Sequence, residues 1–321
     1  MSRSIYITSA EGNSGKSTVA LGLVDTLSHR VQRVGVFRPV TRARDSRGVR
    51  DAAPSVIAPE RDYVLDVLLA HDGVDLAYEE AIGVGYDEVH ADHEAALAVI
   101  VERYHAIAQR SDAVVIVGSD YTDVSSPTEL SFNARIAANL GAPVLLVIGG
   151  RERGASGGRG LAESGPRTPS DMRRVAEVAV AELDHAHAQL LGIIANRADL
   201  EALDAVVAAV QTVAPGALVA AIPEDPYLIA PTVAAVMEAC GGTFVRGDEE
   251  LLQREVLGVV VAGMSMENVL PRLTEGAVVL IPGDRSEVLL AVLMAHASET
   301  FPSLAAIVLY GGFETPDAVQ S

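Results

Sequence analysis

At residues 9–18 the chain reads Ser9-Ala10-Glu11-Gly12-Asn13-Ser14-Gly15-Lys16-Ser17-Thr18, which has the composition of a phosphate-binding loop. An apolar run at residues 5–7 precedes it, and Val19, Leu23 and Leu27 follow at the four-residue spacing of an amphipathic helix. In such a loop, glycines let backbone N–H groups face phosphate oxygens, the lysine reaches the outer phosphates, and the next hydroxyl ligates Mg²⁺. The full motif G-x-x-x-x-G-K-[ST] has glycine where Ala10 stands.

The loop predicts a nucleotide site, with ATP or another nucleotide and Mg²⁺ as the cofactor. The predicted phosphate-binding residues are Gly12, Asn13, Gly15, Lys16, Ser17 and Thr18, with Ser17 as the magnesium ligand. The alternative is that the loop is a retained feature of the fold and binds no ligand.

Composition limits the class of protein. The 321 residues suit about two domains, and a hydrophobic content of 49% supports a core in each. The net charge of −19 disfavours nucleic acid and anionic membranes as partners, because both would be repelled. One cysteine, Cys240, gives no disulfide framework, and the sequence has no signal-peptide pattern or membrane-length apolar run, so a cytoplasmic location is expected.

Short apolar runs alternate with helical patterns, which predicts an α/β fold with a parallel sheet and helices on both faces. The runs of the first layer lie at residues 5–7, 33–37, 113–117, 144–148, 190–195 and 217–222. A helix is predicted after Pro169, with Ser170 as its N-cap. Further apolar runs at 256–261, 277–281 and 305–309 predict a second, smaller α/β unit, and the expected domains are 1–226 and 227–321.

The sequence resembles the N-terminal region of long-form phosphate acetyltransferases, which interconvert acetyl-CoA and phosphate with acetyl phosphate and CoA. The resemblance is nearly co-linear and covers almost the whole chain outside 41–60 and the Gly-rich segment that begins at Arg151. The motifs that carry it are G-K-S-T-V-A-L-G-L (15–23), V-G-V-F-R-P-V (34–40), R-D-Y-V-L-D-V-L-L (61–69), V-G-S-D-Y-T-D-V-S-S-P-T-E-L (117–130), E-V-L-G (255–258), P-G-D-R-S-E-V (282–288) and Y-G-G-F (310–313).

The resemblance implies a first domain similar to dethiobiotin synthetase, then a DRTGG domain, with acyl transfer carried out by a third, C-terminal domain. We expect that catalytic domain to be missing here and the DRTGG unit to be truncated at its C-terminal end. The implied role is a regulatory and assembly region, with nucleotide sensing, in a homo-oligomer. Two alternatives stay open: a stand-alone ATP-dependent ligase of the dethiobiotin synthetase type, and an interaction module without catalysis.

The resemblance also assigns roles to four positions. Val117 stands where dethiobiotin synthetase has a glutamate that holds Mg²⁺, and Asp120 either substitutes for it or caps the loop. Arg38 replaces a substrate-binding lysine, and is either an anion contact or a strand-end arginine that lies in solvent or pairs with Asp45 or Asp51. Asn196 either reads the adenine ring or forms a turn.

Three polar clusters have simpler structural explanations. Residues 126–129 form the pattern of a helix capping box. His90 with His93, and His185 with His187, are expected to be solvated rather than metal ligands. At residues 283–286, Asp284 or Ser286 is expected to cap a helix, and Arg285 with the free N–H groups there could contact an anion. The alternatives for this segment are a structural turn and an inter-subunit contact.

Overall fold

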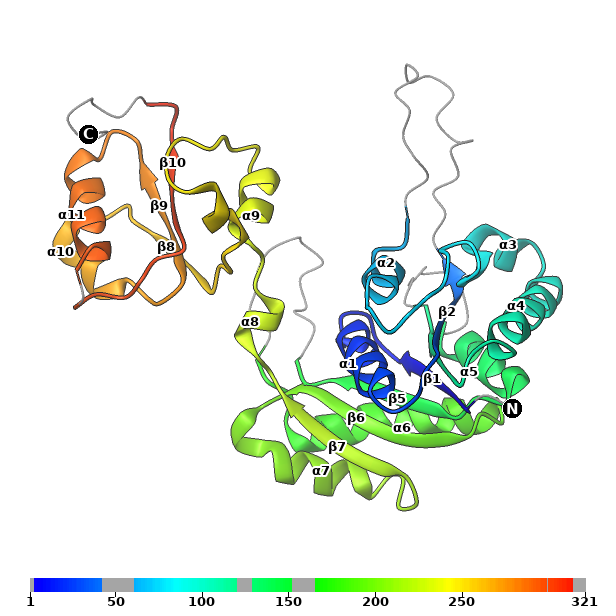
Figure 1. Ribbon diagram of the computed structural model, residues 1–321. Helices are drawn as coiled ribbons and strands as arrows, with labels where there is room; N and C mark the ends of the chain where they lie inside the picture. Colours follow the sequence, from blue (N-terminus) through cyan, green and yellow to red (C-terminus); the bar gives the residue numbers. More distant parts are fainter. Residues whose placement is uncertain (1–2, 42–60, 120–128, 152–164, 299, 314–321) are drawn as a thin grey trace. The chain divides into compact units, whose positions relative to one another are not determined.

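The computed structural model describes residues 3–41, 61–119, 129–151, 165–298 and 300–313. The chain divides into two compact units, Met1–Glu224 and Asp225–Ser321 (Figure 1). The predicted Asp120, Asp45, Asp51 and the start of the 126–129 capping box lie outside the described residues.

The first unit is built on a seven-stranded sheet with the strand order β3-β2-β4-β1-β5-β6-β7. Every neighbouring pair is parallel, which confirms the predicted α/β class. The strands are β1 (Arg3–Ser9), β2 (Val34–Thr41), β3 (Ile82–Gly85), β4 (Ala113–Val117), β5 (Val144–Gly149), β6 (Leu190–Ala198) and β7 (Leu218–Pro223). All residues of β2 and β4 are buried, because helices cover both faces of the sheet at its centre.

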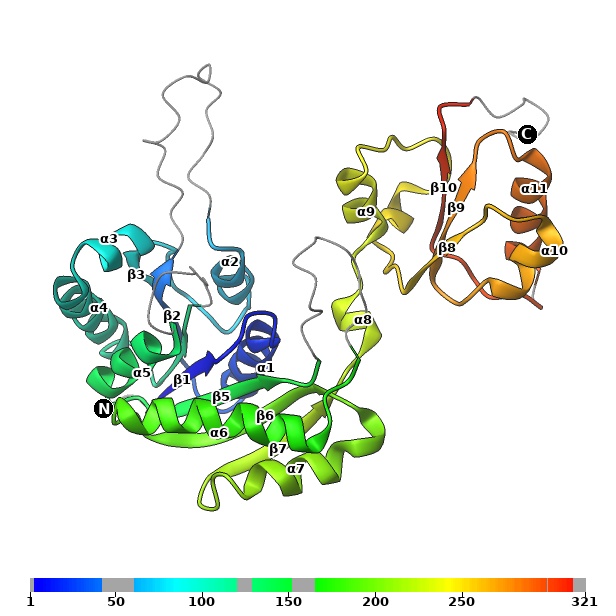
Figure 2. The same ribbon diagram turned by 180° about the vertical axis from the view of Figure 1, so that it is seen from behind.

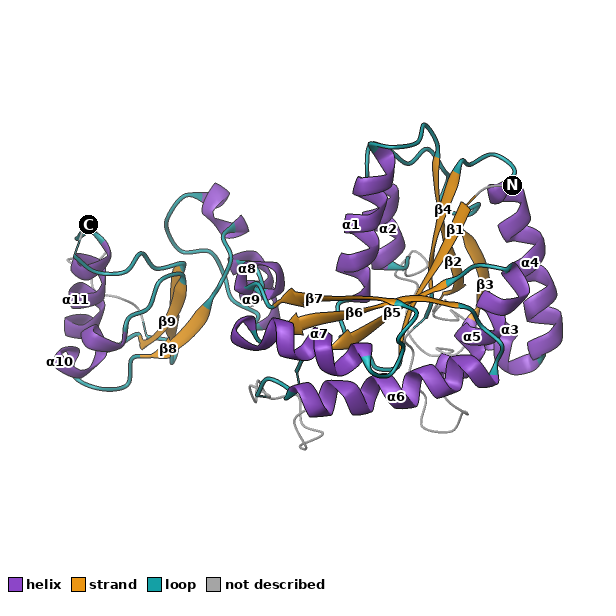
Figure 3. Cartoon of the chain, turned by 90° about the horizontal axis from the view of Figure 1, so that it is seen from below, coloured by secondary structure: helices purple, strands orange, loops and turns teal. Residues whose placement is uncertain are grey.

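Helices of the first unit pack on two opposite faces of the sheet (Figures 2 and 3). They are α1 (Lys16–Ser28), α2 (Tyr63–Leu69), α3 (Tyr86–Ala91), α4 (His93–Ala108), α5 (Glu129–Leu140), α6 (Pro169–His185) and α7 (Leu203–Gln211). Buried residues of α1 and α2 form one core with one face of the strands, including Ala20 and Leu65. Those of α3 to α7 form the other core, including Ile100 and Met172. The carboxyl ends of the strands therefore meet at one edge, where parallel sheets bind ligands.

Two local predictions need correction. The N-cap of α6 is Thr168 rather than Ser170: Pro169 takes the first helical position, and the Thr168 hydroxyl accepts from the backbone N–H of Asp171 at 3.2 Å. The Asp171 carboxylate accepts from Thr168 in return, and these hydrogen bonds lower its pKa. Strand β3 was missed, since two of its four residues are glycines and so weaken the strand signal.

The second unit has a three-stranded parallel sheet in the order β10-β9-β8. Its elements are α8 (Pro226–Ile229), α9 (Val233–Ala239), β8 (Gly258–Val261), α10 (Met266–Val269), β9 (Ala277–Pro282), α11 (Ser286–His296) and β10 (Ala306–Tyr310). A separate core joins β9 to α11, with Val279, Ile281, Val288 and Val292 fully buried. The predicted smaller α/β unit is therefore present.

Candidate functional site: a phosphate loop at the edge of the parallel sheet

The phosphate loop connects β1 to α1 and contains two residues with positive φ, a backbone conformation that residues other than glycine rarely adopt. Asn13 has φ 61° and Gly15 has φ 79°, both in the left-handed region. Gly15 is the N-cap of α1, and because it is a glycine it has no side chain that could cap the first N–H groups of the helix. The first turn of α1 therefore presents N–H groups that phosphate oxygens can accept from.

Neighbouring side chains hold the loop in place. The Ser9 hydroxyl accepts from the backbone N–H of Glu11 at 3.1 Å and donates to its carbonyl at 2.7 Å. Buried Asn196, near the end of β6, donates its amide to the Ser14 carbonyl at 2.9 Å. A Cβ on Gly15 would lie 2.1 Å from the Asn196 amide nitrogen, so another residue there would displace this amide in addition to straining the left-handed backbone.

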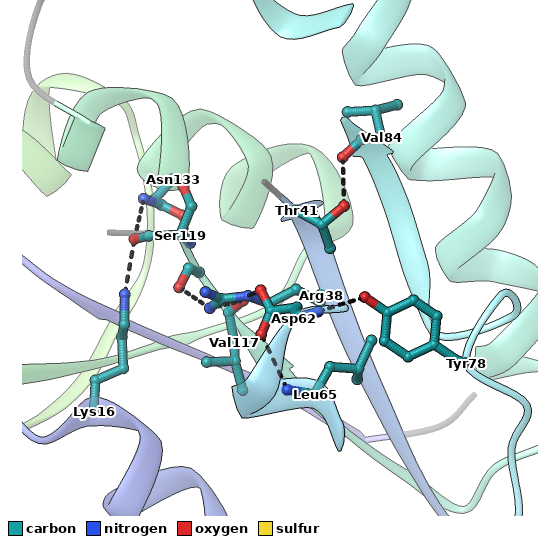
Figure 4. Close-up of polar contacts among 11 residues, drawn as sticks. Lys16, Arg38, Thr41, Asp62, Leu65, Tyr78, Val84, Val117, Ser119 and Asn133 are labelled. Carbon is teal, nitrogen blue, oxygen red and sulfur yellow. Dashed lines mark hydrogen bonds and ion pairs between the residues drawn. The ribbon is translucent and has the colours of Figure 1, made fainter. Parts of the chain in front are cut away.

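Lys16 is the first residue of α1, and its side chain reaches across to the end of β4. Its ammonium donates to the Ser119 carbonyl at 2.8 Å, and the residue is 2% exposed (Figure 4). It is also the only lysine in the sequence, where the other 23 of the 24 basic residues counted as Lys+Arg are arginines. The presence of a single lysine, at this position of the loop, could have been noticed in the sequence, but the sequence analysis did not use it.

The buried side-chain amide of Asn133 holds Ser119, the residue whose carbonyl accepts from Lys16. Asn133, on α5, accepts from the Tyr6 hydroxyl at 2.7 Å and from the Ser119 N–H at 3.2 Å. Its amide nitrogen donates to the Ser119 carbonyl at 3.3 Å (Figure 4) and to the Glu129 carbonyl at 2.9 Å. Burial raises the pKa of the Tyr6 hydroxyl, so it stays protonated and donates. Sequence reasoning missed Asn133, because nothing local marks it.

Arg38 on β2 is buried rather than solvated. Its guanidinium pairs with Asp62 at 2.9 Å and donates to the carbonyls of Gly118 at 2.6 Å and Val117 at 3.3 Å (Figure 4). Asp62 also caps α2 by accepting from the Leu65 N–H at 3.1 Å. Arg38 thus ties β2, α2 and the end of β4 together, next to the segment that holds Ser119.

The remaining predicted residues that the structure describes belong to the loop itself and differ in exposure. Gly12 and Ser17 are half-buried, while Asn13 and Thr18 are exposed. The Val117 side chain is 1% exposed and belongs to the core under α1, so it offers no ligand to a cation. Among the residues that the structure describes, no group of three or more His, Cys, Asp or Glu could hold a metal ion.

Arginines that the sequence did not single out also lie at this edge. The Arg167 guanidinium forms a two-pronged ion pair with Glu11 of the phosphate loop, at 2.9 and 3.0 Å. Arg151 and Arg197 both pair with Glu224, which follows β7. Burial, and to a lesser extent the charge of Arg151, lowers the pKa of Arg197.

The turn at residues 283–286 of the second unit differs from its prediction. Arg285 is the N-cap of α11 and makes no side-chain cap hydrogen bond, so neither Asp284 nor Ser286 caps the helix. The Arg285 side chain instead donates to Glu287 at 2.6 Å and to the Met264 carbonyl at 3.1 Å. The hydrogen bond from Arg285 lowers the pKa of Glu287.

Comparison with known proteins places this geometry in a family. The family model AAA_26, described as an AAA domain, matches residues 3–232. The chain belongs to this AAA family. The model of the DRTGG domain matches residues 235–321, so we refer below to an AAA unit and a DRTGG unit.

Several curated proteins similar to this chain share one name, which confirms the resemblance drawn from the sequence. Phosphate acetyltransferase of Nitratidesulfovibrio vulgaris is 29% identical over 325 residues, covering 98% of this chain and 42% of that protein. The Synechocystis protein of the same name is 28% identical over 323 residues, covering 100% and 43%. The Escherichia coli protein is 21% identical over 337 residues, covering 98% and 43%. The chain thus spans less than half the length of these relatives.

Solved structures similar to this chain include nucleotide complexes. A single-residue variant of Cyanothece McdA in complex with ATP is 17% identical with a TM-score of 0.41, covering 77% of this chain and 99% of that one. The septum site-determining protein MinD of Pyrococcus horikoshii, complexed with Mg-ADP, is 22% identical with a TM-score of 0.38, covering 71% and 83%. Separately, no helix among the described residues is long and apolar enough to cross a membrane.

Proposed function

We propose that this chain is the N-terminal regulatory and assembly region of a phosphate acetyltransferase, and that its AAA unit binds a nucleoside polyphosphate with Mg²⁺. In this proposal the acyl transfer between acetyl-CoA and phosphate takes place in a part of the protein beyond these 321 residues. Two observations support this proposal: the relatives described above are all named phosphate acetyltransferase, and the chain spans 42% and 43% of the length of two of them. Assembly as a homo-oligomer in the cytoplasm is part of the same proposal.

The main observation in support of nucleotide binding is that position 16 has a lysine and not an arginine. Arginine serves at every other Lys or Arg position of the chain, so a need for positive charge alone would be met by arginine here too. A compact ammonium on a flexible stem fits a phosphate loop, whereas a planar guanidinium is larger and has fixed donor directions. The buried position of Lys16 beside Ser119 supports a specific role for the ammonium.

The residues around the loop fit a nucleotide with Mg²⁺. Gly15 and the first turn of α1 would bind the phosphates through their N–H groups, and the Ser17 hydroxyl would ligate the ion. The ion would neutralise phosphate charge. One N–H of Asn196 is committed to the loop, so any contact to the base would use its other polar atoms.

The residues near the loop favour nucleotide binding without catalysis by the AAA unit. Val117 places an apolar side chain where a metal carboxylate would be needed, and Arg38 already has a buried carboxylate partner. These features disfavour the stand-alone ligase. They suit a unit in which nucleotide binding shifts the equilibrium between conformations of a larger enzyme, provided that it binds those conformations unequally.

Replacing Lys16 with alanine is expected to weaken binding of Mg-ATP and Mg-ADP by about 10- to 100-fold, since one charge-assisted hydrogen bond to phosphate is lost. Lys16→Arg should restore only part of the affinity, because the site is closed around a smaller group. Isothermal titration calorimetry of the full chain measures both. Arg30→Ala, an exposed residue just after α1, is the matched control for loss of one positive charge. A wild-type chain that binds neither nucleotide would contradict the proposal and favour a pure interaction module.

The isolated chain is expected to form no acetyl phosphate from acetyl-CoA and phosphate. Release of CoA, followed with a thiol reagent, measures this directly, and a phosphate acetyltransferase of full length serves as the positive control. Turnover by the 321 residues alone would overturn the assignment as a regulatory region.

A further inference from the structure

The phosphate loop contains a carboxylate whose charge opposes its proposed ligand. Glu11 is the only acidic residue among positions 9–18, and Lys16 is the only basic one. The charges of the bare loop therefore cancel. A carboxylate this near bound phosphates would repel them unless another group compensates its charge.

Arg167 supplies that compensation. Its guanidinium meets both carboxylate oxygens of Glu11, at 2.9 and 3.0 Å, in the two-pronged geometry of strong arginine–carboxylate pairs. The Arg167 side chain is 11% exposed and that of Glu11 is 25% exposed, so solvent screens the pair only in part.

Arg167 is itself fixed against the sheet edge that carries the loop. Its guanidinium donates to the Gly149 carbonyl at 2.8 Å, and its backbone N–H donates to the Gly150 carbonyl at 2.7 Å. Gly149 lies against the loop, since a Cβ added there would be 3.5 Å from the Ser14 Cα. Arg167 thus reaches Glu11 while it is held by the carboxyl end of β5.

We propose that Arg167 is a positioning residue that neutralises Glu11 and thereby sets the affinity of the phosphate loop for highly charged nucleotides. This inference rests on the proposed nucleotide binding. Its consequence is that the two members of the pair act on affinity with opposite signs. Loss of Arg167 exposes the ligand to the Glu11 carboxylate, and loss of the carboxylate leaves Arg167 as additional positive charge beside the phosphates.

The test is calorimetry of the full chain with Mg-ATP, Mg-ADP and AMP. Arg167→Ala should weaken Mg-ATP binding by about tenfold, Glu11→Gln should strengthen it by about two- to fivefold, and the double variant should lie within about threefold of wild type. The loss in Arg167→Ala should be larger for Mg-ATP than for AMP. It should also shrink in about 0.5 M salt, because the Debye length then falls to about 4 Å.

Controls separate this inference from a structural role and from the proposed function. Arg173→Ala removes a half-exposed arginine of α6 that pairs with Glu177, and should leave affinity unchanged. If both single variants weaken all three ligands alike and the double variant is weaker still, the pair only supports the loop and the inference is wrong. If wild type binds no nucleotide, the proposed function fails first, and the inference fails with it.

Discussion

Replacing Asp62 with alanine is expected to destabilise the AAA unit by about 3–5 kcal/mol, because it removes the carboxylate that balances a buried guanidinium. The side chains of Arg38 and Asp62 are 3% and 4% exposed, and their charged atoms are 2.9 Å apart. The same change removes the cap of α2, which contributes about 1 kcal/mol of this loss.

Two variants divide these contributions. Asp62→Asn keeps an acceptor for the Leu65 N–H and removes only the charge, so its loss should be nearly as large as that of Asp62→Ala. Adding Arg38→Met to Asp62→Asn should recover part of the stability, because no buried charge then needs a partner.

Asp66→Ala, in the same helix, is the matched control. Asp66 pairs with Arg61 at 2.7 Å, but these side chains are 37% and 54% exposed, so the loss should stay below about 1 kcal/mol. Urea unfolding followed by circular dichroism suits a chain without tryptophan, and hydrogen exchange of β2 and β4 locates the change in the AAA unit. Equal losses in Asp62→Ala and Asp66→Ala would contradict the structural role of the buried pair.

Replacing Asn133 with leucine is the second large change, with an expected loss of about 3–5 kcal/mol. The Tyr6 hydroxyl and the Ser119 N–H would both lose their acceptor inside the protein, at about 1–3 kcal/mol for each unsatisfied group. The carbonyls of Ser119 and Glu129 would lose a donor as well.

A double variant identifies the cause of that loss. In the wild type, Tyr6→Phe should destabilise, because it removes the hydrogen bond to Asn133. In the Asn133→Leu background it should instead stabilise, because it removes a buried hydroxyl that has lost its acceptor. Asn139→Leu, at an exposed position of the same helix, should change stability by less than about 1 kcal/mol. Destabilisation by Tyr6→Phe in both backgrounds would show that the Tyr6–Asn133 bond is not the origin.

Local patterns predicted most of the fold. The parallel strands were recognisable because a strand covered on both faces is largely apolar, as in β4 and in the first four residues of β2. Strand β3 has no such signal, because Gly83 and Gly85 interrupt it and its burial comes from neighbours that are distant in sequence. The cap of α6 was misplaced by two residues, since Thr168 and Ser170 flank Pro169 with equivalent hydroxyls and the proline position distinguishes them.

For the candidate site, the sequence predicted the loop but not its surroundings. Gly15 and Lys16 were identified from spacing alone. Neither Asn133 nor Arg167 was singled out, because an asparagine inside a helix and an arginine before one are ordinary surface residues in most sequences. Arg38 was expected to contact an anion, to lie in solvent or to pair with Asp45 or Asp51, and its partner Asp62 was not considered.

By itself, then, the sequence determined the phosphate loop, the parallel sheet and the division into two α/β regions, because each depends on the conformational preferences and burial of neighbouring residues. Only the tertiary structure decided which groups distant in sequence contact the loop and the residues beside it. Arg38 meets Asp62 across 24 residues, Lys16 meets Ser119 across 103, and Asn196 meets Ser14 across 182. Such pairs form where the carboxyl ends of strands distant in sequence come together at one edge of the sheet, and no local pattern records which strands those are.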